Sequence, residues 1–134
     1  MAWESNATAK RGIYACWIDS NHHEKPQRIS AKNANSRNPA VVALADGSLF
    51  AAWDSVRDGS ANLYGAWCKQ GQWADEQILT HDARIERHVT LASRNNEVWL
   101  AWQAQSFKGL RINSVEEQII GIAKLEGKRL EAPY

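Results

Sequence analysis

Short apolar runs alternate with turn-forming residues along the chain. The run AVVALA at 40–45 is followed by Asp46-Gly47 and then by the apolar run LFAAW at 49–53. Asp-Gly and Asn-Asn pairs, such as Asn95-Asn96, tolerate the positive φ that two-residue hairpin turns require. The pattern therefore predicts hairpins of short β-strands, and the small apolar residues at 40–45 predict a strand buried on both faces.

One stretch of the chain predicts a complete unit of four strands. The strands are expected at 40–45, 48–55, 63–69 and 76–80. Between the second and third strands we expect a polar loop, VRDGSAN at 56–62, because it is rich in turn-forming residues. The Gln-Gly-Gln sequence at 70–72 predicts a tight turn before the fourth strand.

Tryptophan spacing indicates that this unit is repeated. Trp3, Trp53 and Trp102 lie in AWES, AWDS and AWQA, at spacings of 50 and 49 residues. GIYACWI at 12–18 matches NLYGAWC at 62–68 at the same spacing of 50 residues. Self-similarity at a fixed period is the signature of a repeat architecture. We therefore expect a single repeat domain at 1–134, with copies at about 1–36, 37–85 and 86–134.

The first and third copies are expected to depart from the complete unit. The first begins at its second strand and so lacks an inner strand. In the third copy, IIG at 119–121 aligns with LYG at 63–65, which leaves about seven extra residues before its third strand. The alignment predicts a strand from Ile119 onward. The segment from Asn38 aligns with the segment from Arg87.

A period near 50 residues with four strands per unit is typical of β-propeller blades. We therefore expect an all-β, β-propeller-like protein of about three four-stranded antiparallel blades per chain, the first lacking its inner strand. Tryptophans at repeated positions predict packing between blades rather than ligand contact. This interpretation covers Trp17, Trp53, Trp67 and Trp102, and Trp99 is also expected in the core because it matches Phe50.

The stretch at 38–80 resembles blades of bacterial propellers of the sialidase-like and related six-bladed kind. The resemblance is carried by a Pro-containing start, an apolar strand, a DG turn, an aromatic strand ending in WDS, and a loop with RDG. Sialidase blades usually carry an Asp-box, S-x-D-x-G-x-T-W, and here only Gly71 and Gly127 of that motif remain. The stretch is also similar to blades of fucose-binding bacterial lectins, but FAAWDS lacks their arginine.

Composition narrows the functional classes. Among 134 residues, 16 Lys and Arg balance 15 Asp and Glu, so electrostatics offer no support for a nucleic-acid or membrane-surface function. No apolar run is long enough for a transmembrane helix, and no signal peptide is visible. The product is expected to be cytoplasmic if Met1 is the natural start. Cys16 and Cys68 are expected to be buried or half-buried thiols, and neither a metal site nor a cofactor is expected.

Candidate ligand-binding residues cluster at two kinds of loop that open on one face of a propeller. The residues expected to line this mouth are Arg37, Asp54, Arg57, Asp58, Arg87 and His88. Carboxylates accept hydroxyl hydrogen bonds and arginines donate in a fork, which suits a polar ligand such as a glycan. Trp73 has no aromatic counterpart in the third copy and is added as a candidate for stacking. In the alternative interpretation, the aspartates satisfy loop amides and pair with nearby arginines.

Two functions follow from this set. The first is a non-catalytic binding or interaction module that recognises a polar ligand at the loop face. The alternative is a sialidase-like glycoside hydrolase or a fragment of one, although no nucleophile or matched acid pair is marked in the sequence. We expect no hydrolase activity. Three blades per chain also predict a homodimer that closes a six-bladed ring, because open blades leave apolar faces in water.

Overall fold

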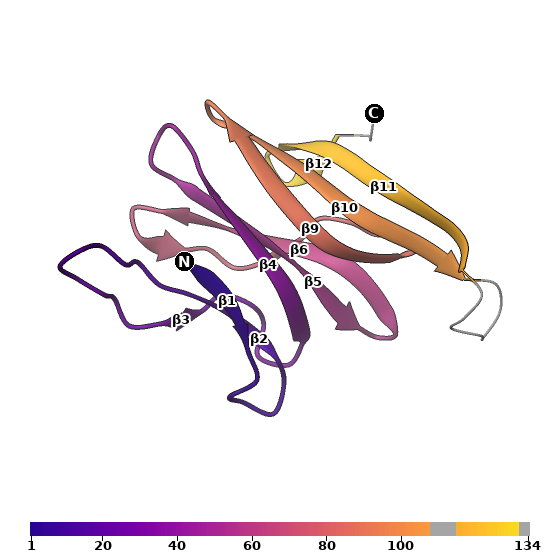
Figure 1. The fold of residues 1–134 in the computed structure, drawn as a ribbon, viewed down its shortest axis with the longest axis horizontal. Coiled ribbons are helices and arrows are strands. Elements are labelled where there is room, and N and C mark those ends of the chain that lie inside the picture. Colours follow the sequence, from indigo (N-terminus) through magenta and orange to yellow (C-terminus); the bar gives the residue numbers. More distant parts are fainter. Residues whose placement is uncertain (108–114, 132–134) are drawn as a thin grey trace.

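The computed structural model describes residues 1–107 and 115–131 (Figure 1). Twelve strands form three antiparallel sheets, and the described residues contain no helix. The expected all-β class and the expected division into three antiparallel sheets are both confirmed. In the described part of the chain, no helix is long and apolar enough to cross a membrane.

The first sheet has three strands in the order β1-β2-β3. These are β1 (Ala2–Ser5), β2 (Gly12–Ala15) and β3 (Gln27–Arg28). Among the described residues, β1 pairs only with β2, so one edge of β1 is unpaired. The first sheet therefore has no described counterpart of the first strand of the complete unit, which we call the inner strand, as predicted.

The second sheet contains five strands, one more than predicted. These are β4 (Asn35–Ala43), β5 (Leu49–Arg57), β6 (Ser60–Lys69), β7 (Gln72–Trp73) and β8 (Gln77–Ile78). The extra strand arises because the chain returns along β6 twice, first as β7 directly after the turn and then as β8.

The third sheet has four strands in the order β12-β11-β10-β9. These are β9 (Ile85–Arg94), β10 (Glu97–Phe107), β11 (Val115–Glu126) and β12 (Arg129–Leu130). The predicted strand from Ile119 onward is confirmed and begins earlier, at Val115. The extra residues expected between β10 and β11 fall mostly at 108–114, which lie outside the described residues.

Turn chemistry explains most of the hairpins. Gly47 and Asn95 have φ values of 81° and 56°, as expected for the turns that they occupy. The predicted loop at 56–62 is wrong, because β5 continues to Arg57 and β6 starts at Ser60. Asp58 and Gly59 both have positive φ and close this hairpin as a two-residue turn.

Strand register corrects two of the sequence alignments. Arg37 pairs with Asp54, and Arg87 pairs with Gln103 at the same place in the next sheet, so Arg87 is the counterpart of Arg37 and not of Asn38. Gly121 pairs with Trp102 as Tyr64 pairs with Trp53, so Gly121 is not the counterpart of Gly65. A shift of one residue moves side chains to the opposite face of a sheet, and matching of glycines in the sequence does not detect it.

The three sheets lie face to face, and each interface holds its own apolar core (Figure 1). Trp53 is fully buried in the cluster between the first and second sheets, together with Ile13 and Ala66. Trp102 holds the same position in the cluster between the second and third sheets, together with Phe50 and Leu100. The packing role predicted for Trp53 and Trp102 agrees with this burial.

Other apolar positions are more exposed than predicted. Val41 is 40% exposed, so the strand at 40–45 is not buried on both faces. The first sheet has no described inner strand to lie against this part of β4, which explains the exposure. Trp17 is 44% exposed beyond the end of β2, whereas Trp67 packs against Phe50 at a centroid distance of 4.7 Å. Trp99 is half-buried on the outer face of the third sheet rather than in the core.

Candidate functional site

A bulge interrupts the inner strand of both the second and the third sheets. In β4 the register shifts between Arg37 and Ala40, and in β9 it shifts at the matching place beside Gln103. The bulge residues Asn38 and His88 have positive φ values of 51° and 55°. Bulges redirect backbone groups and side chains, and they occur often beside functional sites.

Each bulge is bonded to a carboxylate of the preceding sheet. Glu4 Oε2 accepts a hydrogen bond from the Asn38 backbone N–H at 3.0 Å. Asp54 Oδ2 accepts one from the His88 backbone N–H at 3.1 Å. Glu4 and Asp54 hold the same repeat position, so this contact recurs at both interfaces between sheets.

The two carboxylates differ in their surroundings. Asp54 is only 3% exposed and also accepts a hydrogen bond from Asn38 Nδ2 at 2.7 Å. Glu4 is exposed and pairs with Arg11 at 3.1 Å. Both acids are therefore already bonded to groups of this chain. Asp54 satisfies amides, as the alternative interpretation expected, but it forms no ion pair with an arginine of the described residues.

A cleft of about 300 Å³ opens where these contacts meet. Its lining residues are Glu4, Arg11, Arg37, Asn38, Asp54, Val56, Arg87 and His88. Arg37 and Arg87 are exposed, and neither side chain forms a hydrogen bond or an ion pair with another described residue. We call this cleft the arginine cleft. It presents two guanidinium groups that have no partner in the described chain.

Four of the seven residues predicted from the sequence therefore lie in one cleft: Arg37, Asp54, Arg87 and His88. Arg57 does not line the cleft. Side chains alternate between the two faces of a strand, so Arg57 points to the face opposite to that of Asp54 and Val56, which do line it. Its Nη1 pairs with Glu76 Oε1 at 2.6 Å, and its guanidinium stacks over the Tyr64 ring at 3.7 Å. Asp58 is in the two-residue turn beyond Arg57 and does not line the cleft.

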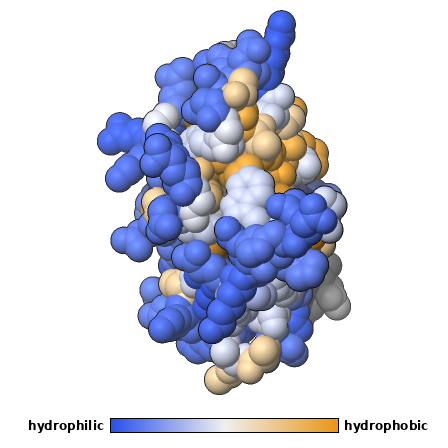
Figure 2. All heavy atoms as spheres, turned by 90° about the vertical axis from the view of Figure 1, so that its left-hand side faces the viewer, coloured by the Kyte–Doolittle hydropathy of each residue, from blue (hydrophilic) through white to orange (hydrophobic). Residues whose placement is uncertain are grey.

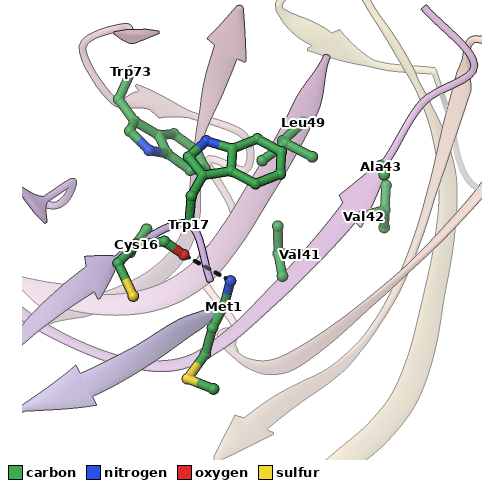
Figure 3. Close-up of a pocket in the computed structure, with 9 residues that line it drawn as sticks. Met1, Cys16, Trp17, Val41, Val42, Ala43, Leu49 and Trp73 are labelled. Carbon is green, nitrogen blue, oxygen red and sulfur yellow. Dashed lines mark hydrogen bonds between the residues drawn. The ribbon is translucent and has the colours of Figure 1, made fainter. Parts of the chain in front are cut away.

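Trp73 lies at the other end of the second sheet. It pairs with Cys68 in strand register and lines an apolar cleft of about 160 Å³ between the first and second sheets. Trp17, Val41 and Leu49 line the same cleft (Figure 3). Figure 2 shows hydrophobic residues gathered in one area on the side where the first sheet lies. The candidate aromatic and the candidate arginines thus do not form one site.

Four lining residues of the arginine cleft were missed by sequence reasoning: Glu4, Arg11, Asn38 and Val56. The position of Glu4 matches that of Asp54 in the repeat. This match was the available signal for Glu4. Arg11 and Val56 carry no signal in the sequence, because only the stacking of the sheets brings them to the cleft.

Glu86 is a further buried acid, and it faces away from the arginine cleft. Its Oε1 accepts a hydrogen bond from Trp102 Nε1 at 2.9 Å, inside the interface between the second and third sheets. Burial raises the pKa of the Glu86 carboxyl, and the hydrogen bond from Trp102 offsets part of this rise. Its position is that of a packing group and not of a group open to a ligand.

Thiols and potential metal ligands are dispersed in the structure. Cys16 is half-buried and Cys68 is buried, and both are free, as predicted. Burial raises the pKa of the Cys68 thiol, which makes it less reactive at neutral pH. Within 1–107 and 115–131, no three His, Cys, Asp or Glu side chains gather closely enough to hold a metal ion.

Comparison with known proteins found no family model that matches the chain and no curated protein that is similar to it.

Proposed function

We propose that this protein is a non-catalytic binding module whose arginine cleft recognises an anionic glycan. The observation that carries the proposal is the pair Arg37 and Arg87. They hold the same position in successive sheets, they line one cleft, and neither has a partner among the described residues. Glu4 is paired with Arg11, and Asp54 is bonded only to uncharged amide groups. The three arginines of the lining outnumber its two acids, so the cleft has an excess of one positive charge.

The lining chemistry favours charge recognition over stacking on a neutral sugar. The only ring among the lining side chains is the imidazole of His88, and Trp73 lies at the opposite end of the second sheet. Guanidinium groups bind carboxylates and sulfates with two parallel hydrogen bonds. Two equivalent arginines suit a ligand that repeats such groups, as a chain of acidic sugars does.

The test is calorimetric titration with a sulfated oligosaccharide, a uronic-acid oligosaccharide and a neutral oligosaccharide of similar length. We expect one or both acidic probes to bind, more weakly as salt increases, and the neutral probe not to bind. Replacement of Arg37 or Arg87 by alanine should weaken binding about tenfold, equivalent to about 1.4 kcal/mol.

Arg129→Ala is the matched control, because Arg129 is an exposed arginine on β12 outside the cleft. Equal losses in all three variants would mean that binding follows net charge and not the cleft. Absence of binding to both acidic probes at low salt would contradict the proposed ligand class.

The alternative function, a glycoside hydrolase, would require different chemical groups in the same cleft. A glycosidase needs two carboxylic groups that can reach the scissile bond, one to protonate it and one to attack or to activate water. Asp54 and Glu4 are instead bonded to bulge amides. We expect no turnover of a fluorogenic sialoside or glycoside panel. Turnover that is abolished by Asp54→Ala or Glu86→Ala would overturn this part of the proposal.

We also propose that the three sheets are propeller blades and that a second copy of the chain closes the ring. Phe50 and Ala52 are fully buried beneath the third sheet, and their counterparts on the third sheet, Trp99 and Ala101, face outward. Ile120 is 64% exposed on the same outer face. A further sheet stacked there would bury this face as the third sheet buries the second.

Light scattering tests this assembly. We expect a mass of twice 15.0 kDa at micromolar concentration and dissociation to monomers in Ile120→Lys. Val56→Lys is the control, because Val56 is 44% exposed but lies on β5 of the second sheet, which takes no part in the contact between copies. A folded wild-type monomer at the same concentration would exclude ring closure by a second copy.

A further inference from the structure

The inner edge of the first sheet is open in a way that the other two sheets are not. β5 pairs with the inner strand β4, and β10 pairs with the inner strand β9, in both cases antiparallel. β1 has the corresponding place in the first sheet, but none of the described residues pairs with its second edge. An unpaired strand edge presents backbone donors and acceptors to any extended segment that fits.

The apolar cleft lies beside this open edge. Met1 and Cys16 line it from the first sheet, and Val41 and Leu49 line it from the second (Figure 3). In the figure, the Trp17 and Trp73 side chains lie together on one side of the cleft. The cleft thus combines an apolar lining with a nearby row of free backbone groups.

The neighbouring interface shows what fills the equivalent space. Between the second and third sheets, Val42 and Leu44 pack in the apolar cluster, and they come from the inner strand β4 and the turn that follows it. Leu91, the counterpart of Val41, packs against that cluster and is only partly exposed. Val41 is exposed because the first sheet supplies no counterparts of Val42 and Leu44.

We propose that this site binds an extended peptide segment as the missing inner strand of the first sheet. The segment pairs antiparallel with β1 and places two aliphatic side chains, two residues apart, in the apolar cleft. Backbone hydrogen bonds to β1 provide affinity, and the cleft selects the alternate side chains. The partner chemistry is that of the chain's own inner strand, in which Val42 and Leu44 have this spacing.

A small apolar molecule fits these observations less well, because it would fill the cleft and leave the edge of β1 unpaired. The inference is independent of the arginine cleft. That cleft lies at the other end of β4, near Arg37, while the apolar cleft lies near Val41 and Leu49. Failure of one binding test therefore does not affect the other.

The probe is a synthetic peptide with the sequence of residues 35–45, NSRNPAVVALA, added to the whole 134-residue protein. Hydrogen exchange measured by NMR reports on the amides of β1. We expect the peptide to protect those β1 amides that point to the open edge. A scrambled peptide, and a peptide with aspartate at the positions of Val42 and Leu44, should not protect them.

Two protein variants make the test specific. Val41→Lys places a charged side chain in the cleft at a position already exposed, so the fold should be retained while peptide binding weakens about tenfold or more. Val115→Lys is the control, because Val115 is 48% exposed but lies on β11 of the third sheet and lines neither cleft. Equal weakening in the two variants would contradict the proposed position of the peptide.

The remaining outcomes are also decisive. Protection of β1 that appears without peptide and increases with protein concentration would mean that a second copy supplies the strand, which supports the site. Binding of the peptide without protection of β1 would overturn the proposal. Absence of binding to a protein that is monomeric and folded would overturn it as well.

Discussion

Trp53 and Trp102 occupy the same position in successive sheets, yet their indole N–H groups have different partners. Trp102 Nε1 donates to Glu86, which lies on the adjacent inner strand. Trp53 Nε1 is buried and has no hydrogen-bond partner among the described residues. The residue at the matching place is Ser36, whose hydroxyl bonds with Ser55 at 3.1 Å instead.

The contrast shows that the two interfaces share their apolar packing but differ in how their buried polar groups are hydrogen-bonded. The interface between the first and second sheets leaves a buried donor unsatisfied, which is unfavourable. The interface between the second and third sheets satisfies that donor but buries a carboxyl, and this raises the pKa of Glu86. Contacts between apolar side chains at equivalent positions are thus sufficient to stack the repeats. The hydrogen bonds of the buried polar groups differ from one interface to the other.

The carboxylates at the bulges should show the largest difference between the interfaces. Asp54→Ala leaves the His88 N–H and the Asn38 amide without their buried acceptor, so we expect the free energy of unfolding to fall by about 3 kcal/mol. Glu4→Ala removes an exposed acceptor, and the loss should stay below about 1 kcal/mol. Urea unfolding followed by tryptophan fluorescence measures both. Equal losses would mean that burial of Asp54 has no effect on the strength of the contact.

Gly12 on β2 and Gly121 on β11 provide the next comparison, because the two strands hold equivalent places in the first and third sheets. A Cβ at Gly121 would lie 2.3 Å from the buried Trp102 ring, whereas a Cβ at Gly12 would meet the end of the flexible Arg28 side chain at 2.5 Å. Gly121→Ala should therefore destabilise the protein by about 2 kcal/mol through overpacking. Gly12→Ala should have a smaller effect, because the Arg28 side chain can shift with the loss of some hydrogen bonds to loop carbonyls, whereas the Trp102 ring is fixed in the core. Thermal unfolding that shows the opposite order would contradict this interpretation of Gly121.

Replacement of Trp53 or Trp102 by phenylalanine tests directly the difference in hydrogen bonding between the two indole N–H groups. Trp102→Phe deprives Glu86 of a hydrogen bond, while Trp53→Phe removes a donor that had no partner. Both variants lose similar volume, so Trp102→Phe should cost roughly 1 kcal/mol more than Trp53→Phe in chemical denaturation. An equal loss would indicate that Trp53 Nε1 finds a partner in solution.

The pH dependence of stability should show the smallest effect. The pKa of Glu86 is raised in the folded state, so the folded protein holds this proton more tightly than the unfolded chain does. The contribution of Glu86 to stability is therefore fully present below the unfolded pKa and is lost as pH rises through the folded pKa.

Glu86→Gln should remove this loss and keep an acceptor for Trp102. The variant should then gain stability relative to the wild type as pH rises from about 4.5 toward neutrality. Glu97→Gln is the control, because Lys124 lowers the pKa of the exposed Glu97 carboxyl and gives the opposite sign. A difference between Glu86→Gln and wild type that does not change with pH would contradict the raised pKa.

Much of the fold was predictable because its signals are local. Asp46-Gly47 and Asn95-Asn96 permit the backbone angles of hairpin turns, and the tryptophan spacing marks units whose strands pair with sequence neighbours. The prediction failed at Asp58-Gly59, where a polar stretch was interpreted as a loop although the same dipeptide chemistry closes a tight hairpin. Arg57 was therefore assigned to the wrong face.

What the sequence by itself determined is the number of units, the order of their strands and four residues of the arginine cleft. The tertiary structure alone decided which residues of different sheets line one cleft, such as Arg11 and Arg87, and which repeat positions remain uncovered, such as Val41. The physical reason is that turns and alternation depend on neighbours along the chain. Register, bulges and burial between sheets depend on contacts between distant segments, and a shift of one residue reverses which face a side chain occupies.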